Sequence, residues 1–292
     1  MYVWICAILI AGVGHAFWDN SFRWLVSNDP ETSILHMHWV RMSFITFLLL
    51  LASLKSDPLP SKTTTWWFFF SITGFVLPSV CYTICSYLTG YRIAISIQTF
   101  IPLFILCLQH KWPSVQQCRS LICAFMGTVC LWWYTPWMDD STDLWKVWFS
   151  VIAAFIQVSS LAVWFNMLSS INSGQLRSIT LGSTIGLFIF FLTFVIWTPQ
   201  HLAAASMGQL NMWIFVIGGC ALSATCKYWV ISAASREFPI DAVSIFECIH
   251  PMATLVLDAY YHKNQFGLED LLAIIFISIG WILYPTKTYL RI

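Results

Sequence analysis

Apolar residues run along this chain in ten long stretches that are separated by short polar connections. A helix needs about 20 predominantly apolar residues to cross the hydrocarbon core of a bilayer. The stretches therefore predict transmembrane helices, over residues 3–25, 33–54, 65–88, 92–109, 116–135, 145–167, 178–198, 210–234, 241–259 and 268–286. Helix breakers such as Asp57-Pro58 and Asn172-Ser173-Gly174 mark the connections between them.

The polar positions of the first half recur in the second half. Residues 93–102 and 242–251 are both apolar segments with one polar residue, Gln98 or Glu247, four positions before a proline. Five segments per half is an odd number, so the two repeats would lie in opposite orientations in the membrane. We therefore expect one all-α membrane domain of ten transmembrane helices, built as two inverted five-helix repeats around a central cavity. The predicted repeats are residues 1–138 and 139–292.

The distribution of charge predicts an orientation. If the N-terminus is cytoplasmic, eight basic residues fall on the inner side: Lys55, Lys62, Lys111, Arg119, Arg177, Arg236, Lys287 and Arg291. Four fall on the outer side: Arg23, Arg92, Lys146 and Lys263. Because basic residues favour the cytoplasmic side of short loops, we expect both termini in the cytoplasm, in a plasma or inner membrane. The first segment has no basic start and contains His15 and Asp19, so we expect a retained helix and not a signal peptide.

Composition narrows the class of protein. Hydrophobic residues make up 59% of the chain and charged residues 9%, whereas about 25% are charged in soluble domains. A net charge of +1 argues against a nucleic-acid partner. The sequence has no Gly-x-x-x-x-Gly-Lys string, which excludes direct ATP coupling. The ten cysteines lie mostly within apolar segments without metal-finger spacing, so we interpret them as small buried hydrophobic residues.

Ionisable residues inside the predicted helices are the first candidates for a functional site. Each costs about 2.5–3.5 kcal/mol at the bilayer centre and therefore needs a partner or a wet cavity. His15, Trp18 and Asp19 share one face of the first helix, where they could form a cavity wall. Alternatively, Asp19 pairs with Arg41 or Arg23 and holds the first two helices together.

Gln98 and Glu247 occupy equivalent positions of the two repeats. The proline four residues later removes a backbone donor, so a free carbonyl would coincide with a polar side chain at midplane depth. Gln98 and Glu247 could therefore line a cavity or form hydrogen bonds between helices, and Glu247 could also carry a proton. Lys227 would pair with Glu247, either as a gate or as a purely structural pair.

Helix two and helix nine supply further candidates. Arg41 could hold a carboxylate or phosphate through its planar fork, or it could snorkel to the outer interface with His36 and His38. These two histidines point apart by about 200°, which argues against a metal clamp. His250 could relay protons or donate to a substrate, or it could be a packing residue.

Among the 17 tryptophans, Trp18, Trp39, Trp164 and Trp229 could form a cation–π cage, although most tryptophans of such a chain face lipid or the interface. Trp18 and Trp164 are near-equivalent positions of helices one and six. We expect no metal, cofactor or catalytic residue. The predicted substrate-binding set is His15, Trp18, Asp19, Arg41, Gln98, Trp164, Asn166, Lys227, Glu247 and His250.

The repeat, the stretch Gly14-His15-Ala16-Phe17-Trp18-Asp19-Asn20 and the proline-centred fourth and ninth helices resemble the drug/metabolite transporter superfamily, in particular its EamA-like members. Many of these carry His-Ala-x-Trp-Asn in helix one, whereas Asp19 stands here at the Asn position. Many also have a Gly-Glu pair after the fourth helix, where this chain has His110-Lys111. The resemblance implies ten helices in two inverted repeats and export of amino acids or related metabolites. The ending Gly280-Trp281-Ile282-Leu283-Tyr284 is similar to the last helix of nucleotide-sugar and triose-phosphate members.

Three functions follow from these observations. The first is a secondary transporter that exports small polar metabolites, such as amino acids or organic cations, by alternating access. Its energy would come from a gradient, with Glu247 or Asp19 as the proton carrier, or the substrate would flow downhill without coupling. The second is a nucleotide-sugar or sugar-phosphate antiporter, which predicts a strongly basic cavity. The third, an intramembrane enzyme, requires the histidines to converge, and we do not expect it. The expected partners are a small-molecule substrate, lipid and protons, in a monomer or homodimer.

Overall fold

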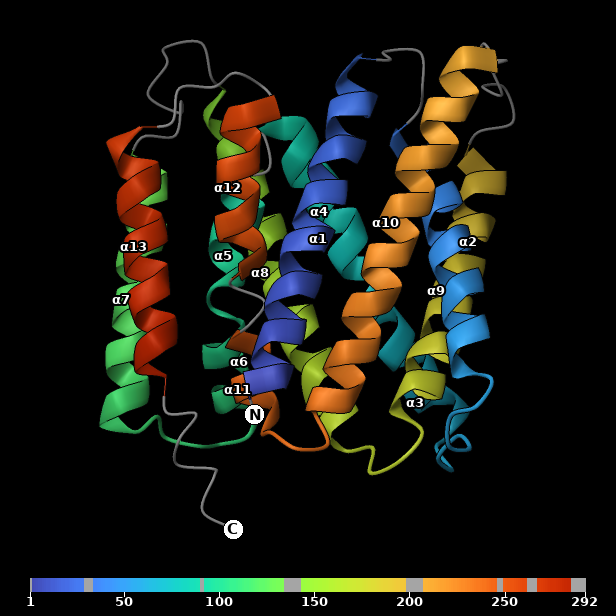
Figure 1. Ribbon diagram of the computed structural model, residues 1–292, viewed down its shortest axis with the longest axis horizontal. Helices are drawn as coiled ribbons and strands as arrows, with labels where there is room; N and C mark the ends of the chain where they lie inside the picture. The colour runs from blue at the N-terminus through green and yellow to red at the C-terminus, as the bar shows by residue number, and fades with distance from the viewer. Residues whose placement is uncertain are drawn as a thin grey trace.

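The computed structural model describes residues 2–28, 34–89, 92–133, 143–197, 207–245, 249–261 and 267–284. All regular structure in these ranges is helical, and the helices stand side by side in an upright bundle (Figure 1). The helices are α1 (Tyr2–Asn28), α2 (Ile34–Ser53), α3 (Thr64–Ser71), the π-helix η1 (Ile72–Val76), α4 (Leu77–Leu88), α5 (Arg92–Gln98), α6 (Ile101–Leu108), α7 (Val115–Trp133), α8 (Leu144–Ser169), α9 (Gln175–Trp197), α10 (Met207–Ala234), α11 (Ile240–Ile245), α12 (Ile249–Tyr261) and α13 (Leu268–Leu283).

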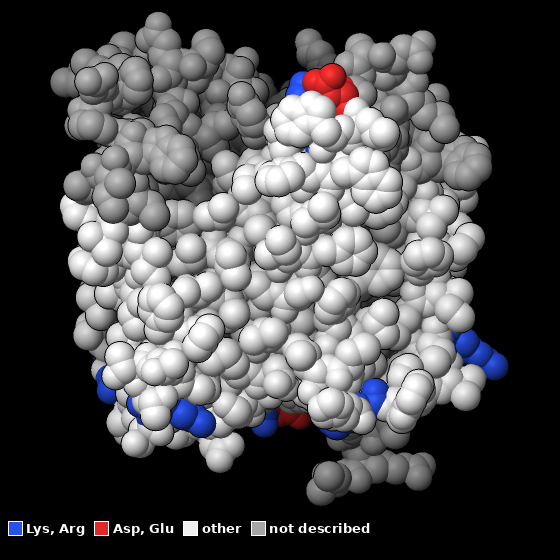
Figure 2. All heavy atoms as spheres, turned by 180° about the vertical axis from the view of Figure 1, so that it is seen from behind, with Lys and Arg blue, Asp and Glu red and all other residues white. Residues whose placement is uncertain are grey.

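The bundle has the surface of a membrane protein. Five stretches are long and apolar enough to cross a bilayer: Thr64–Cys85, Leu144–Ser169, Gln175–Leu192, Ile214–Ala234 and Ile240–Leu257. Large apolar side chains such as Trp148, Phe149 and Ile152 on α8 are at least half exposed on the outside of the bundle. Figure 2 shows Lys and Arg gathered along the lower edge of one face, below a band of described atoms that carries neither sign of charge. The chain is therefore an all-α membrane protein.

Each predicted segment contains helix, and the predicted helix 92–109 is divided within the described residues. It consists of α5 and α6, whereas α11 and α12 of the predicted helix 241–259 lie on either side of residues 246–248, which are outside the described ranges. Between α5 and α6, Thr99 and Phe100 form a turn. The expectation of one continuous helix is wrong here, because Pro102 lacks an N–H and its ring clashes with the preceding turn.

Side chains stabilise the break between α5 and α6. The carbonyl of Ser96 accepts hydrogen bonds from the hydroxyls of Thr99 (2.8 Å) and Thr128 (3.1 Å). The indole N–H of Trp132 donates to the Ser96 hydroxyl at 2.7 Å. Thr128 and Trp132 belong to α7, so a neighbouring helix satisfies polar groups that the interrupted helix cannot satisfy itself.

Packing between helices follows a regular scheme. Helix α1 packs against α10 and α12, whereas α8 packs against α4, α5 and α6. Helix α2 packs against α9 and α10, α3 packs against α9, and α7 packs against α13. In Figure 1, the Tyr2 end of α1 and the Leu283 end of α13 lie at the same lower end of the bundle. The buried aromatic core is formed by Trp164, Phe165, Phe70 and Phe75.

Candidate functional site

A cavity of about 130 Å³ lies inside the bundle. Helices α1, α2, α4, α5, α8, α10 and α12 and the π-helix all contribute side chains to its wall. This volume is smaller than the roughly 300–1,000 Å³ that is typical of small-molecule sites. The lining residues are His15, Arg41, Gly74, Pro78, Ser79, Tyr82, Gln98, Gln157, Leu161, Trp164, Phe165, Lys227, Tyr228, Ile231 and His250.

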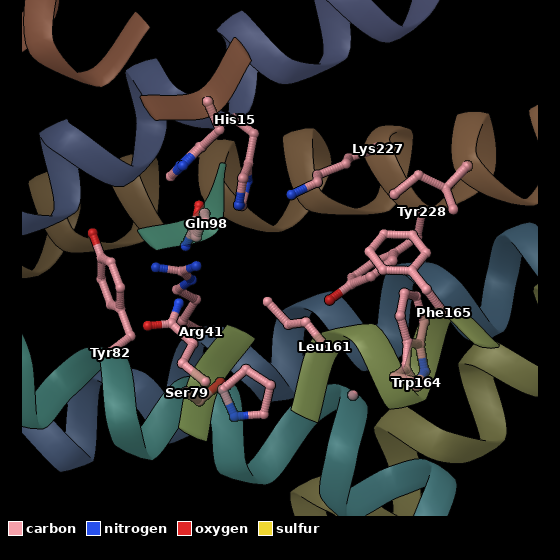
Figure 3. Close-up of a pocket in the computed structure, with 15 residues that line it drawn as sticks. His15, Arg41, Ser79, Tyr82, Gln98, Leu161, Trp164, Phe165, Lys227 and Tyr228 are labelled. Atoms are coloured by element: carbon pink, nitrogen blue, oxygen red, sulfur yellow. The ribbon is translucent and has the colours of Figure 1, made fainter. Parts of the chain in front are cut away.

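Two cationic side chains enter the cavity from different helices. Figure 3 shows the guanidinium of Arg41, from α2, directed toward Gln98, and the ammonium of Lys227, from α10, directed into the same space. Gln98 is the last residue of α5, so the break before Pro102 places its amide at the cavity wall. Arginine and lysine donors that converge in a low-dielectric site can bind a carboxylate or phosphate.

A pair of histidines forms another part of the wall. The rings of His15 on α1 and His250 on α12 lie 5.2 Å apart between centroids and are tilted by 35°. His250 is buried, with 6% of its surface exposed. The spacing of the histidines along the sequence had suggested that they lie on separate faces, whereas these two converge. Imidazole nitrogens can donate or accept hydrogen bonds, so this pair is suited to contact a polar ligand.

Trp164 closes the aromatic end of the cavity. Its indole lies directly on the backbone of Gly74 in the π-helix, where a Cβ would come within 2.2 Å of the indole Cδ1. The rings of Phe165 and Tyr228 lie 5.0 Å and 6.1 Å from the indole. A π-turn often marks a functional site in a helix, and here it allows close approach of a large aromatic side chain.

The sequence analysis missed Gln157, a further polar residue of the cavity wall. Gln157 lies on α8 with 3% of its surface exposed, and its Oε1 has no hydrogen-bond partner among the described residues. Its position seven residues before Trp164, on the same face of α8, was the signal that could have identified it. An uncharged amide in an apolar stretch attracts less notice than an ionisable side chain.

Six residues of the predicted set line the cavity: His15, Arg41, Gln98, Trp164, Lys227 and His250. Glu247 and the side chains of Asp19, His36 and His38 lie outside the described residues, so the expected ion pairs of Asp19 and Glu247 remain predictions.

Trp18 and Asn166 are placed outside the cavity. The Trp18 ring lies on Gly219 of α10, where a Cβ would come within 2.4 Å of it, and makes an edge contact with Phe215 at 5.2 Å. Asn166 accepts a hydrogen bond from the Gln109 amide at 3.4 Å, beyond the C-terminal end of α6. Both side chains are therefore occupied by helix packing.

The four tryptophans of the predicted cage do not gather at the cavity. Trp164 lines it, whereas Trp39 packs toward Phe191 of α9 and Trp229 is 53% exposed on the outside. Within the described ranges, no three His, Cys, Asp or Glu side chains come together as metal ligands. Cys81, Cys85 and Cys220 are buried, and Cys6, Cys107 and Cys226 are exposed.

Comparisons with known proteins establish the fold alone. No protein-family model and no curated protein matches the chain. A solved structure, described only as "Crystal structure of protein", is similar with a TM-score of 0.68 at 13% sequence identity, over 95% of this chain and 97% of that chain. The bundle is therefore an architecture that also occurs in an experimentally determined protein of equivalent length.

Proposed function

We propose that the protein is a secondary transporter of small polar metabolites that works by alternating access. The observation that carries this proposal is the polar cavity in the middle of an apolar bundle, lined by helices from both halves of the chain. A bilayer-embedded protein gains nothing in stability from such a cavity, because buried polar groups are costly in hydrocarbon surroundings. Transporters use this arrangement to hold a substrate near the midplane.

The packing scheme supports two inverted repeats of five transmembrane helices each. Exchanging the halves turns the α1–α10 pair into the α8–α4 pair, and the α2–α10 pair into the α9–α3 pair. It turns the contact of α1 with α12 into the contact of α8 with α5, and the α7–α13 pair into itself. Such reciprocal contacts are expected when a pseudo-two-fold axis relates residues 1–138 to 139–292. With the resemblance of the sequence, this favours an EamA-like transporter.

Contacts between the halves at the lower end support alternating access. Arg236 and Asp57 form an ion pair at 3.1 Å, and the Arg177 guanidinium donates to the Leu54 carbonyl at 3.2 Å. Buried Asp241 accepts hydrogen bonds from Tyr284 and from Gln117 (3.3 Å). These contacts must separate for the cavity to open at that end. The basic side chains along the same edge support its predicted cytoplasmic placement (Figure 2).

The cationic side chains of the cavity wall are suited to an anionic group of a substrate. Arg41 and Lys227 both line the wall, and such donors bind carboxylates and phosphates. An amino acid and a sugar phosphate each carry such a group, so this feature supports the proposed metabolite transporter and the second candidate, a nucleotide-sugar or sugar-phosphate antiporter.

A two-stage experiment tests the proposal. Purified protein is first screened by thermal unfolding with L-alanine, choline, glucose 6-phosphate and UDP-glucose. A ligand at a hundredfold excess over its dissociation constant stabilises the folded state by about 2.7 kcal/mol. Each labelled probe is then tested for counterflow into proteoliposomes preloaded with the same unlabelled compound.

Protein-dependent counterflow of L-alanine would support the metabolite transporter, and counterflow of glucose 6-phosphate or UDP-glucose alone would favour the antiporter. Counterflow of choline alone would contradict the anionic preference. Folded protein that moves none of the four probes above protein-free liposomes would contradict the transport proposal.

A further inference from the structure

A groove of about 460 Å³ opens on the outside of the bundle, between α8 and the joined helices η1 and α4. Thr73 and Leu77 line one side of this outer groove, and residues of α8 between Ile152 and Val163 line the other. Both sides belong to helical stretches that are long and apolar enough to cross a bilayer. Because the groove residue Ile152 is 54% exposed, the outer groove opens toward the hydrocarbon of the membrane.

The outer groove and the central cavity are separated by a single seam between helices. Thr73 and Val163 line the groove, and the residues that follow them in the sequence, Gly74 and Trp164, line the cavity. The Trp164 indole lies directly on Gly74, so this contact is part of the partition between the two spaces. A molecule in the groove therefore packs against the back of the cavity wall.

The dimensions of the outer groove match one hydrocarbon chain. Ile152 and Val163 lie eleven residues apart on α8, which at 1.5 Å per residue gives a length of about 16 Å. One leaflet contributes about 15 Å to the hydrocarbon core of a bilayer. Benzene fits in an apolar cavity of about 150 Å³, so 460 Å³ has room for about three such rings, on the order of 18 carbons. This is the size of a common acyl chain.

Other occupants fit the groove less well. The hydroxyls of Thr73 and Ser160 donate to backbone carbonyls of their own helical segments, Phe69 and Gln157, both at 2.8 Å. These hydroxyls thus add little polarity to the groove, and apolar spaces of this kind stay free of water. An α-helix of a second copy, about 10 Å across, would occupy roughly 1,200 Å³ over the same length. The groove is therefore suited to a thinner apolar molecule.

We propose that the outer groove binds one acyl chain of a membrane lipid. The chain lies along α8 from Ile152 to Val163 and fills the space behind the contact of Gly74 with Trp164. Van der Waals packing holds it there, because the surrounding lipid is equally apolar and an unfilled groove would lose these contacts. None of the described residues that line the groove is charged, so the chain and not the head group is recognised. This site depends on the membrane-embedded bundle and is independent of transport.

Two lipids with the same head group test the site in the full-length protein. Delipidated protein in detergent is titrated with dioleoylphosphatidylcholine or with short-chain dioctanoylphosphatidylcholine, and native mass spectrometry counts the lipids bound. We expect one long-chain lipid per protein, and binding of the short-chain lipid weaker by about tenfold or more, because its chains fill less of the groove. A diazirine in the long acyl chain is expected to label α8 between Ile152 and Val163 on irradiation.

Substitution of Ser159 separates the groove from the rest of the lipid-facing surface. Ser159 is a partly exposed groove residue, so Ser159→Phe places a ring where the chain would lie. We expect this variant to bind the long-chain lipid about tenfold more weakly or less well still, and to lose the rise in melting temperature that the lipid gives the wild type. Thr184→Phe is the matched control, because Thr184 is exposed on α9, also within an apolar membrane span, but lies outside the groove.

Several results would overturn the acyl-chain site. Equal binding of both lipids would mean that the head group is recognised, and wild-type protein that retains no lipid would leave the groove without the proposed ligand. Undiminished binding by Ser159→Phe, or photolabelling away from α8, would place the lipid elsewhere. A dimer that Ser159→Phe dissociates would assign the groove to a second copy of the chain. If Ser159→Phe does not fold, the smaller substitution Ser159→Leu must weaken binding of the long-chain lipid for the site to stand.

Discussion

Trp18 on α1 and Trp164 on α8 make the same contact in the two halves of the chain. Each indole lies directly on a glycine of a packed helix, Gly219 for Trp18 and Gly74 for Trp164. A Cβ would approach the ring to 2.4 Å at Gly219 and to 2.2 Å at Gly74. The surroundings differ, because Trp164 is 2% exposed and lines the cavity, whereas Trp18 contacts Phe215, which is 69% exposed.

Other cavity residues follow the same relation. His15 and Leu161 each lie three residues before one of the tryptophans, and both line the cavity. Tyr82 and Lys227 each lie eight residues after one of the glycines, and both line it as well. In the proposed repeat, equivalent positions of the two halves would thus meet at one cavity and carry different chemistry. The two tryptophan–glycine contacts would then be a shared scaffold, and the cavity residues would make the two halves differ.

The largest expected difference between the halves is in the cost of removing the tryptophans. Trp164→Ala should lower the free energy of unfolding by about 3–5 kcal/mol, because it leaves a void among buried aromatic rings. Trp18→Ala should cost about half as much or less, since lipid can fill part of the space. Unfolding of both variants in mixed micelles measures the difference, and equal losses would contradict the structural contrast.

Replacement of the glycines should have the next largest effect. Gly74→Ala forces a methyl group into the Trp164 indole and should cost about 1–3 kcal/mol. Gly219→Ala should cost less, because Trp18 can move toward the surface. Gly218→Ala is the control, since nothing lies within 4 Å of its Cβ and alanine favours a helix. A Gly74→Ala protein with unchanged unfolding behaviour would show that the indole relaxes freely.

The pair Tyr82 and Lys227 tests asymmetry in binding. Lys227→Met removes a cation from the cavity and should weaken binding of L-alanine, the carboxylate probe of the screen, by about 10–100-fold, as for a charged hydrogen-bond partner. Tyr82→Phe removes one hydroxyl at the equivalent position and should weaken it by about tenfold or less. Calorimetry on both variants measures the ratio. Equal losses would argue that the two positions contribute alike to the cavity.

Much of the scaffold was predictable from the sequence because it depends on local composition. The stretch predicted over residues 145–167 is α8 (Leu144–Ser169), since polar residues border the apolar run on both sides. Pro102 indicated a disturbance in the fourth segment. The sequence could not show that the helix ends there, because Thr128 and Trp132 of another helix satisfy the broken turn.

The site was only partly predictable, because the direction in which a side chain faces depends on packing partners. Trp18 and Trp164 are near-equivalent positions of the predicted repeats, yet only the neighbours of each decide whether it lines a cavity. Gln157 was missed because the cost of an ionisable group was the criterion, whereas a buried amide becomes conspicuous only when its missing partner is known. Local patterns thus predict helices, and polar sites require their three-dimensional neighbours.

The smallest effects are expected where the two halves are most alike, at the crossing of α2 and α9. Thr46 shares a hydrogen bond with Ser183 at 2.7 Å, and the Thr180 hydroxyl is shared between the Leu49 carbonyl at 3.2 Å and the carbonyl of Leu176 on its own helix at 2.9 Å. Thr46 lies three residues before Leu49, the partner of Thr180, and Thr180 lies three residues before Ser183, the partner of Thr46. The two contacts are therefore reciprocal. Both are buried away from the cavity. Thr46→Val and Thr180→Val should therefore each cost about 0.6 kcal/mol, the average for hydrogen bonds between membrane helices.

A double-mutant cycle of Thr46→Val with Ser183→Ala isolates the side-chain pair from other effects of the substitutions. A coupling energy of roughly 0.6 kcal/mol would match the hydrogen bond at the crossing. Equal single-variant losses at Thr46 and Thr180, beside unequal losses at Trp18 and Trp164, would show that the halves diverge at the cavity and not in the scaffold. If the threonine losses differ as much as the tryptophan losses do, the divergence extends through the whole bundle.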